Sequence, residues 1–455
     1  MPEQVNALST AEEMRALIEQ GALETLRTLL GEYHPADIAD LLDSLPAEDA
    51  IVLFNLLSTT IASEVLDETG SLVRQELVEK VDDERLADLL DELPMDDAAE
   101  FLEDLPDPTA SRLLGLMEPE EAREVRVLLH YEEETAGRLM TTDVAVLRRH
   151  WTAAEALEYL RSLEAVETLH YLYVVDRNIQ LIGVVPIRNL IVASPDVTIE
   201  TIMVPDVVAV PVTADQEELA EFISRYDFVA IPVVDEANRL LGVVTVDDAL
   251  DVLAEETTED IQRLGGSEPL ANPYFAVSVV QMVRKRVVWL MLLFVASLLT
   301  GTVIRSFERI LTTVALLTAF IPLITGTGGN AGSQTVTTVI RAIAVEEVRP
   351  NDFGRTWRRE VAVGFLLGLL LGIVGMLVGI AQATIAGSDL RVGLIIGLTL
   401  PMVVVWANTV ATLVPIAAER LNIDPTVVSA PLITTIVDAT ALLIYFTTAK
   451  VVLGL

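Results

Sequence analysis

Apolar residues follow two different patterns along the chain, and the change from one to the other falls near residue 280. Beyond this point, long apolar stretches recur, and a bilayer span needs ~20 mostly apolar residues. They predict five membrane-spanning helices, at about 287–304, 310–340, 361–386, 392–418 and 426–455. We therefore expect a five-helix transmembrane domain over residues 272–455.

Residues 1–131 carry leucines at helical spacing between turns that contain proline. The segment Ile38–Pro46 is similar to Leu86–Pro94, and Ala99–Pro106 is a weaker third copy. Repeats of this kind predict an all-α helical solenoid, in which the leucine stripe forms the core.

Residues 137–256 contain a second internal repeat, made of β-branched strands and helical segments. The matching pairs, at offsets of 63, 59 and 59 residues, are Leu139–Val144 with Ile202–Val207, Tyr173–Asp176 with Pro232–Asp235, and Gly183–Val185 with Gly242–Val244. Each unit predicts a strand, a helix, two strands joined by a turn, and a helix. This order looks like a tandem CBS pair, an α/β ligand-sensing module, over 137–250 with units at about 137–199 and 200–250.

An acidic segment over 251–271 joins this repeat to the first apolar stretch. Leu250, Leu253 and Ile261 can form an apolar stripe, and the stretch Asp247–Ile261 around them carries seven carboxylates. We predict a linking helix. Its acids are either a solvated face or a divalent-cation switch, in which facing carboxylates that repel one another are drawn together by the cation.

The charge of the chain is divided in the same way as its hydropathy. The 455 residues carry a formal net charge of −38 and are 52% hydrophobic. Residues 1–280 hold 59 acids and 17 basic residues, whereas 281–455 hold 9 acids and 13 basic residues. So large an acid excess repels phosphates and argues against nucleic-acid binding. The absence of cysteine excludes disulfides and thiolate metal sites.

The distribution of basic residues predicts the orientation in the membrane. The N-terminus has no basic segment followed by an apolar run, so we do not expect a signal peptide. Five spans would leave nine basic residues on the side of the N-terminus and four on the other side. The positive-inside rule then predicts a cell-membrane protein with a cytosolic N-terminus and an external C-terminus.

Asp438 is an acid within the last predicted span. A carboxylate at the centre of a membrane costs at least ~2.5 kcal/mol, so it usually faces a helix bundle or an aqueous path. Thr434 lies four residues earlier, on the same helix face. The alternative is a hydrogen bond between packed helices, or a position closer to the membrane surface.

The segment Pro322–Gln334 contains a proline and four glycines inside an apolar stretch. We expect it to interrupt the helix, so that its carbonyls can contact a cation or its water shell. Asn330 and Gln334, four residues apart, favour this interpretation. The alternative is close helix packing through small residues.

The donor atoms limit the ions that such a pore would suit. All four histidines lie within the first 170 residues, so the membrane half offers oxygen ligands only. These favour Mg²⁺ or Ca²⁺ over soft metals. One carboxylate among hydroxyls and carbonyls suits Mg²⁺ that keeps its waters, although these residues alone do not distinguish Mg²⁺ from Ca²⁺, Na⁺ or a proton.

Taken together, the sequence resembles the MgtE family of magnesium channels along essentially its whole length. The segments that carry the resemblance are Tyr131–Met140, Thr245–Asp248, Thr257–Ile261, Gly326–Gln334 and Asp424–Leu432. The order of the domains matches as well.

The resemblance implies a homodimer with its pore on the dimer axis, closed when cytosolic Mg²⁺ is high. The residues assigned to the pore are Asp438, Thr434, Gly328 and Asn330. The implied Mg²⁺-sensing acids are Glu64, Asp96, Glu100, Glu217, Asp227, Asp248, Asp251, Glu256, Glu259, Asp260 and Asp424. It also implies ATP at the CBS pair, near Tyr171, Arg188 and Phe228.

Three positions depart from the family pattern. Ala430 replaces a frequent Asn, Thr434 replaces a frequent Ala, and Asn189 replaces an Asp expected near the nucleotide. The function expected is a Mg²⁺-selective channel. The alternatives are a proton- or Na⁺-coupled transporter that uses Asp438, and a membrane receptor that senses nucleotide without transport. An enzyme is not expected, because no nucleophile–base pair stands out.

Overall fold

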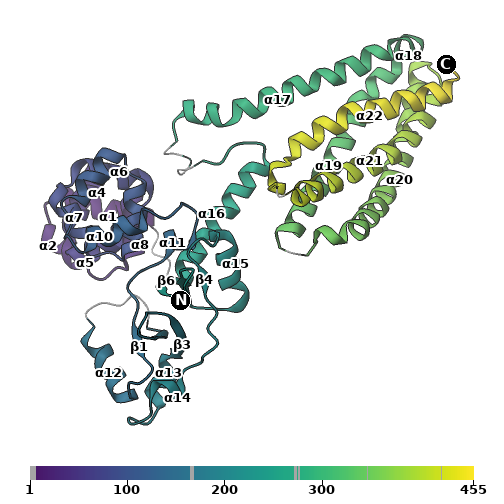
Figure 1. Ribbon diagram of the computed structural model, residues 1–455. Helices are drawn as coiled ribbons and strands as arrows, with labels where there is room; N and C mark the ends of the chain where they lie inside the picture. Colours follow the sequence, from purple (N-terminus) through teal and green to yellow (C-terminus); the bar gives the residue numbers. More distant parts are fainter. Residues whose placement is uncertain (1–6, 164–168, 271–273, 275–276, 346, 422) are drawn as a thin grey trace. The chain divides into compact units, whose positions relative to one another are not determined.

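The computed structural model describes residues 7–163, 169–270, 274, 277–345, 347–421 and 423–455 (Figure 1). The chain divides into two compact units, Met1–Glu256 and Thr257–Leu455. Residues 1–6 of the expected N-terminal domain and residue 271 of the expected linking helix lie outside the described residues.

The first unit begins with short helices, as the repeats predict. Pro46, Pro94 and Pro106 each stand directly before a helix, where the fixed φ of proline and its missing N–H do no harm. Leucines on the inner faces form one core that includes fully buried Leu42, Leu53 and Leu66. The helices are α1 (Ala7–Glu19), α2 (Leu23–Leu30), α3 (Pro35–Ser44), α4 (Ala47–Phe54), α5 (Thr59–Glu68), α6 (Ser71–Lys80), α7 (Asp83–Leu90), α8 (Met95–Glu103), α9 (Asp107–Leu114) and α10 (Glu121–Leu128).

Two small sheets of the same design follow, which confirms the predicted CBS pair. In each sheet the first strand pairs parallel with the second, and the second pairs antiparallel with the third. The first CBS unit contains β1 (Val146–Arg148), α12 (Ala153–Ser162), β2 (Tyr171–Val175), β3 (Leu181–Pro186) and α13 (Ile187–Val192). The second CBS unit contains β4 (Val210–Pro211), α15 (Gln216–Tyr226), β5 (Ala230–Val234) and β6 (Leu240–Thr245). The short helices α11 (Ala136–Leu139) and α14 (Ile199–Ile202) precede the first and the second CBS unit.

The linking helix differs from its expected bounds. It is α16 (Val246–Leu264), which starts directly after β6 rather than at residue 251. No proline or glycine separates the last strand from the acidic segment, so the helix of the CBS unit and the predicted linker are continuous. It ends at Gly265–Gly266, where Gly266 has a φ of +76° that an L-residue rarely adopts.

The second unit contains long apolar helices. They are α17 (Val279–Ser306), α19 (Ile321–Ala344), α20 (Phe353–Ala386), α21 (Arg391–Arg420) and α22 (Ala430–Leu453), with shorter α18 (Glu308–Thr313), η1 (Ala315–Phe320), η2 (Pro350–Asp352) and η3 (Pro425–Val427). Among the described residues, α17, α20, α21 and α22 have the length and hydropathy of a membrane span. The fifth long helix, α19, has 24 residues, but its many polar side chains and glycines lower its hydropathy.

The expected span over 310–340 is wrong in two respects. The chain breaks near Val314, so residues 308–320 form α18 and η1 instead of the first half of a span. In addition, α19 runs unbroken through Gly326–Gln334. Pro322 lies in its first turn, where proline favours a helix start. The predicted interruption at the glycines is therefore absent, and their carbonyls belong to a regular helix.

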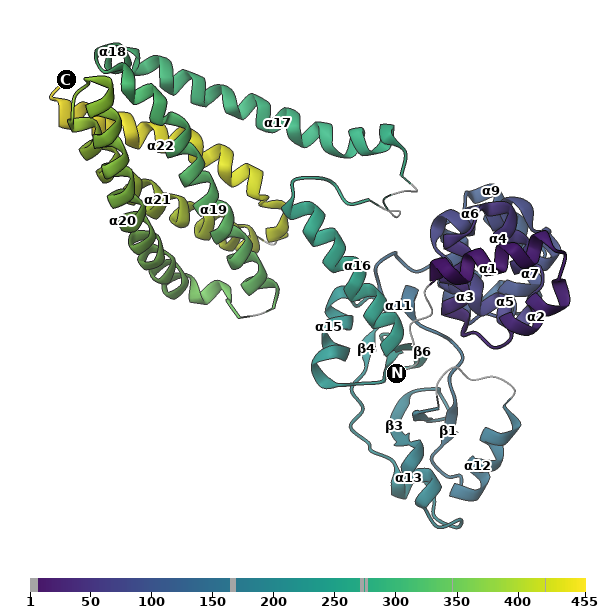
Figure 2. The same ribbon diagram turned by 180° about the vertical axis from the view of Figure 1, so that it is seen from behind.

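Helices α20 and α21 lie side by side along their length, as both views show (Figures 1 and 2). Their contact is lined by a column of buried glycines on α20, which are Gly364, Gly368, Gly372, Gly375 and Gly379. A Cβ atom built on Gly368 would lie 2.6 Å from the Cα of Pro401. The two backbones therefore approach as closely as glycine allows, which favours helix association in a membrane.

We expect Gly368→Ala to destabilise the second unit, because its methyl group would force the two backbones apart at a cost of about 1–3 kcal/mol. Thermal unfolding of the detergent-solubilised protein measures this loss. Gly354→Ala is the matched control, because it lies on the same helix with no atom within 4 Å of a Cβ placed there. Equal unfolding temperatures for the two variants would contradict the close-packing account.

Candidate functional site

Three carboxylates meet where the N-terminal helices contact the second CBS unit. Asp96 and Asp97 lie in the first turn of α8, and Asp248 lies in the first turn of α16. One oxygen from each lies within 4.8 Å of those of the other two. Helix N-termini stabilise negative charge, which offsets part of the repulsion among the three acids.

These three carboxylates could hold one divalent cation. Mg²⁺ binds oxygen ligands at ~2.0–2.1 Å, so ligands on opposite sides of the ion are ~4.2 Å apart. Three oxygens within 4.8 Å thus need little movement to share one ion. Asp248 is held in place by Thr245, whose backbone N donates to Oδ2 at 3.2 Å and whose hydroxyl donates to the same oxygen at 2.5 Å.

The sequence assigned Asp96 and Asp248 to this site but missed Asp97. Only 6% of Asp96 is exposed, whereas Asp97 and Asp248 are half-buried. A second acid beside Asp96 was a visible signal, but the family resemblance named only Asp96 of the pair. The structure shows that both acids of the Asp96–Asp97 pair reach it.

A second acidic group lies beside the first and includes Asp67, Glu100 and Asp251. Burial raises the pKa of Asp67 to about 6, and the charges of Glu100 and Asp251 add to the rise, while Arg74 opposes it. Loss of solvent around their carboxyls also raises the pKa of Glu100 and of Asp251, although both side chains keep exposed surface. Glu100 and Asp251 were predicted sensor acids, whereas Asp67 was missed.

The other predicted sensor acids of the first unit lie apart from the Asp96–Asp97–Asp248 group. Glu64 on α5 and Glu217 on α15 are exposed, as is Asp227 at the end of α15. Glu256 accepts a hydrogen bond of 3.0 Å from Nε2 of Gln216. Within the described residues, none of these four belongs to the three-carboxylate group.

In the second unit, Arg263 bridges two of the predicted acids. Its guanidinium lies 2.6 Å from Oε2 of Glu259 on the same helix and 3.1 Å from Oδ2 of Asp424. Asp424 also accepts a hydrogen bond of 2.8 Å from the backbone N of Thr426. Asp260 lies half-buried on the same helix. Asp424 therefore faces α16 through an arginine that the sequence analysis had not singled out.

The predicted pore residues lie on α19 and α22. Thr434 lies one turn from half-buried Asp438 on α22, and its Oγ1 lies 3.1 Å from Oγ of Ser333 on α19. Within the described residues, the Asp438 carboxylate has no hydrogen-bond partner from the chain. Asn330 is exposed on α19.

Gly328 lies in a different environment from the one predicted for it. It is buried, and a Cβ there would lie 2.7 Å from Val403 and 2.9 Å from Val437. This is the close packing that the sequence left as the alternative for this segment, and Gly328 lies in a regular helix rather than in an interruption. A residue without a Cβ is needed at this position because α19 fits tightly between α21 and α22.

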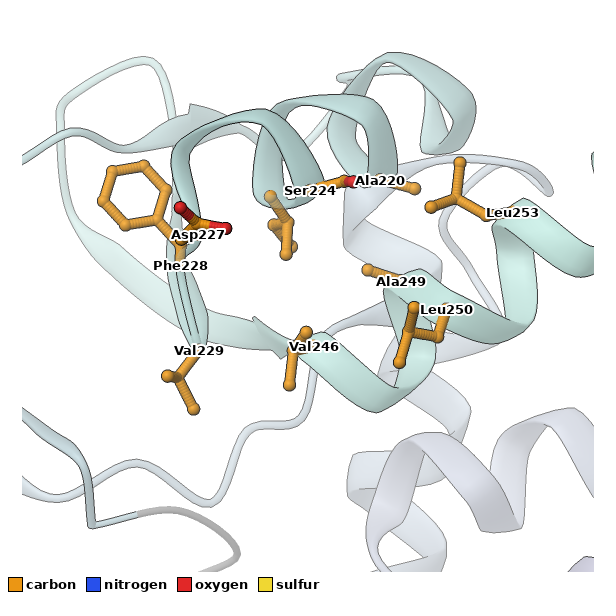
Figure 3. Close-up of a pocket in the computed structure, with 10 residues that line it drawn as sticks. Ala220, Ser224, Asp227, Phe228, Val229, Val246, Ala249, Leu250 and Leu253 are labelled. Atoms are coloured by element: carbon orange, nitrogen blue, oxygen red, sulfur yellow. The ribbon is translucent and has the colours of Figure 1, made fainter.

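A pocket of about 350 Å³ lies between α15 and α16, lined by Phe228, Asp227 and apolar residues of both helices (Figure 3). Phe228 also stacks on Tyr226, with ring centroids 6.0 Å apart. Tyr171 begins β2 and Arg188 is exposed on α13, and neither lines this pocket. The pocket thus contains one of the three residues assigned to the nucleotide.

Three family models match the chain in the order of its domains. They describe an MgtE intracellular N domain over residues 33–134, CBS domains over 136–196 and 199–255, and a divalent cation transporter over 321–448. The magnesium transporter MgtE of Thermus thermophilus is 38% identical over 447 residues, which are 97% of this chain and 98% of that protein. The magnesium transporter MgtE of Bacillus subtilis is 32% identical and covers 94% of each chain.

Solved structures match the first unit. The cytosolic domain of the Mg²⁺ channel MgtE in complex with ATP is 40% identical, covers 53% of this chain and 99% of its own, and has a TM-score of 0.51. The soluble part of a magnesium transporter is 33% identical over 55% of this chain, with a TM-score of 0.52. The fold, the spans and these matches define a membrane protein of the divalent cation transporter class. Within that class, the chain belongs to the MgtE family.

We expect Asp67→Asn to raise the unfolding temperature at about pH 7.5 by a few degrees and to flatten its dependence on pH. The folded protein binds the Asp67 proton more tightly than the unfolded chain, because the pKa rises from 3.8 to about 6. This contribution to the free energy of unfolding is therefore full below about pH 3.8 and is lost as the pH rises through about 6.

Thermal unfolding in detergent and EDTA, measured between about pH 4.5 and 7.5, tests this expectation. The matched control is Asp196→Asn, because Asp196 is exposed. If the unfolding temperature of Asp67→Asn changed with pH as steeply as that of the unmodified protein, tight proton binding by Asp67 would be ruled out.

Proposed function

We propose that this protein is a Mg²⁺-selective channel that admits Mg²⁺ down its electrochemical gradient and closes when Mg²⁺ binds its cytosolic unit. The observation that carries the proposal is the match to magnesium transporters over 97% of the chain. A match of 40% to the cytosolic domain of a Mg²⁺ channel supports the channel class over a pump. Moving two charges through 100 mV releases about 4.6 kcal/mol, so no other energy source is required.

Asp438 is proposed to attract hydrated Mg²⁺ in the pore. It is the single acid of α22, and the part of the chain that is described offers its carboxylate no hydrogen-bond partner. Thr434 and Asn330 would contact the water shell of the ion through a hydroxyl and an amide. Gly328 is left out of this role, because it is buried in a helix contact.

The pore is proposed to lie on the axis of a homodimer. On α19, Asn330 and Gln334 are exposed although they lie in the membrane half of the chain. Polar side chains at membrane depth are costly in lipid, so they normally face protein or water. A second copy of the chain would cover this face and bring two Asp438 carboxylates to one path. The basic residues favour a cytosolic N-terminus and an external C-terminus.

Closure is proposed to depend on Mg²⁺ at Asp96, Asp97 and Asp248, with the remaining predicted acids around them. Without a cation, these carboxylates repel one another across the contact between α8 and α16. Mg²⁺ would hold the two helices together. Because α16 is one continuous helix from Val246 to Leu264, it is suited to carry the change towards the membrane helices.

ATP is proposed to bind the CBS pair near Tyr171, Arg188 and Phe228. The relative whose cytosolic domain was solved in complex with ATP is 40% identical to this chain, which supports nucleotide binding by the first unit. Asn189 in place of an acid predicts weaker contact with the ribose, so binding would be modest.

We expect Asp438→Asn to reduce Mg²⁺ flux into proteoliposomes at least about tenfold, because each protomer loses the one charge that draws Mg²⁺ into the pore. Tenfold corresponds to ~1.4 kcal/mol. Asp389→Asn is the control, because that carboxylate lies between α20 and α21 and pairs with Arg391 at the start of α21. Unchanged flux would remove Asp438 from the pore. Flux that follows a proton or Na⁺ gradient and ignores membrane potential would favour a coupled transporter.

We expect Asp97→Asn to raise the cytosolic-side Mg²⁺ concentration that halves the flux, by about tenfold for the loss of one of three ligands. The measurement is flux through oriented proteoliposomes against Mg²⁺ on the cytosolic side. Asp196→Asn serves again as the exposed control. In the unmodified protein, flux that rises steadily with that Mg²⁺ would contradict closure by Mg²⁺.

A further inference from the structure

Arg74 is a largely buried cation inside the acidic region of the first unit. It lies on α6, and 14% of its side chain is exposed. Its Nη2 donates a hydrogen bond of 2.7 Å to the backbone O of Asp67, and its Nη1 lies 3.4 Å from Oδ2 of Asp104. The guanidinium carbon lies 5.5 Å from the centre of the Phe101 ring, a cation–π contact. Arg74 is therefore held from the end of α5 and from α8 at the same time.

The positive charge of Arg74 acts on four carboxyl groups. Loss of solvent raises the pKa of each of them, and Arg74 opposes the rise at Asp43, Asp67, Glu100 and Asp104. The Nε atom of Arg74 is buried and has no hydrogen-bond partner among the described residues. Burying a guanidinium with an unsatisfied N–H is costly, so the compensation must come from the surrounding negative charge.

This acidic group is continuous with the Asp96–Asp97–Asp248 group. Glu100 lies four residues after Asp96, and Asp251 lies three residues after Asp248, so each pair shares a helix face. The negative charge of Asp251 contributes to the raised pKa of both Asp67 and Glu100. A cation that approaches Glu100 or Asp251 thus meets a region where a positive charge is already present.

We propose that Arg74 is a built-in competitor of Mg²⁺ in this region: it pairs with Asp104, one helical turn after Glu100, and raises the Mg²⁺ concentration at which the sensor responds. The inference rests on the proposed function, because it assumes that Mg²⁺ binds these acids. The guanidinium neutralises part of the repulsion that Mg²⁺ would otherwise relieve. Mg²⁺ therefore gains less free energy on binding than it would at an unoccupied acidic cluster.

The test is a Mg²⁺ titration of protease resistance, on the full chain in detergent, for the unmodified protein and for Arg74→Gln. We expect the half-point of protection to move to Mg²⁺ concentrations at least about 5-fold lower in Arg74→Gln, within the usual range of coupling between two binding events. Arg74→Lys keeps the charge and should retain a half-point near that of the unmodified protein. Arg123→Gln, at an exposed arginine of α10, is the matched control.

Thermal unfolding separates competition from a structural role. We expect Arg74→Gln to unfold at a lower temperature than the unmodified protein in EDTA, and the difference to disappear at saturating Mg²⁺. A difference that persists at saturating Mg²⁺ would mean that Arg74 only supports packing, and the proposal would be wrong. Arg74→Met, which also removes the charge, gives the same test if the glutamine variant does not fold.

The two proposals fail differently. If the unmodified protein gains no protection from Mg²⁺, the proposed Mg²⁺ sensing itself is wrong. If the unmodified protein responds but Arg74→Gln has the same half-point, only the competition is wrong. A half-point that moves to higher Mg²⁺ in Arg74→Gln would also overturn the competition, because it would make Arg74 a support for the Mg²⁺ site.

Discussion

Repulsion among carboxylates across the contact of α8 and α16 is the constraint on which the first unit depends. The apolar core brings these two helices together, and in doing so it places Asp96, Asp97 and Asp248 within ligand distance of one another. Hydrophobic burial and electrostatic repulsion therefore oppose each other at one contact. Positive charge near these acids would lower the repulsion and favour the contact, which is what the proposed closure by Mg²⁺ requires.

The chain supplies part of that charge itself. Arg74 compensates the acids around Glu100, and Arg263 joins Glu259 to Asp424 in the second unit. Both arginines lie beside acids that the family resemblance assigns to Mg²⁺. In both units, an arginine can therefore neutralise carboxylates that are also proposed to bind Mg²⁺. The more of their charge the arginine neutralises, the less free energy Mg²⁺ gains on binding them.

Much of the fold could be predicted from the sequence, because its signals are local and repeated. Leucines with proline turns predicted the N-terminal helices, and two copies of one strand–helix pattern predicted the paired sheets. The wrong predictions concern segments whose conformation depends on packing against other helices. Glycines read as a break in α19 are accommodated in a regular helix, because Val403, Val437 and Thr434 need the space that side chains would fill.

The site was predictable only in part, for a similar reason. The family resemblance assigned Asp96 and Asp248, but spacing along one helix does not reveal which acids of another helix will face it. Asp97 meets Asp248, and Arg74 meets Asp104, across more than 20 residues of sequence, and no local pattern marks such contacts.

The glycine column between α20 and α21 limits how the membrane unit can move. With backbone against backbone and Pro401 wedged at Gly368, these helices cannot slide or rotate past one another without a steric clash. The two helices therefore form a stiff pair within the bundle. If the proposed ion path widens, the movement would therefore be expected in α17, α19 or α22 rather than between α20 and α21.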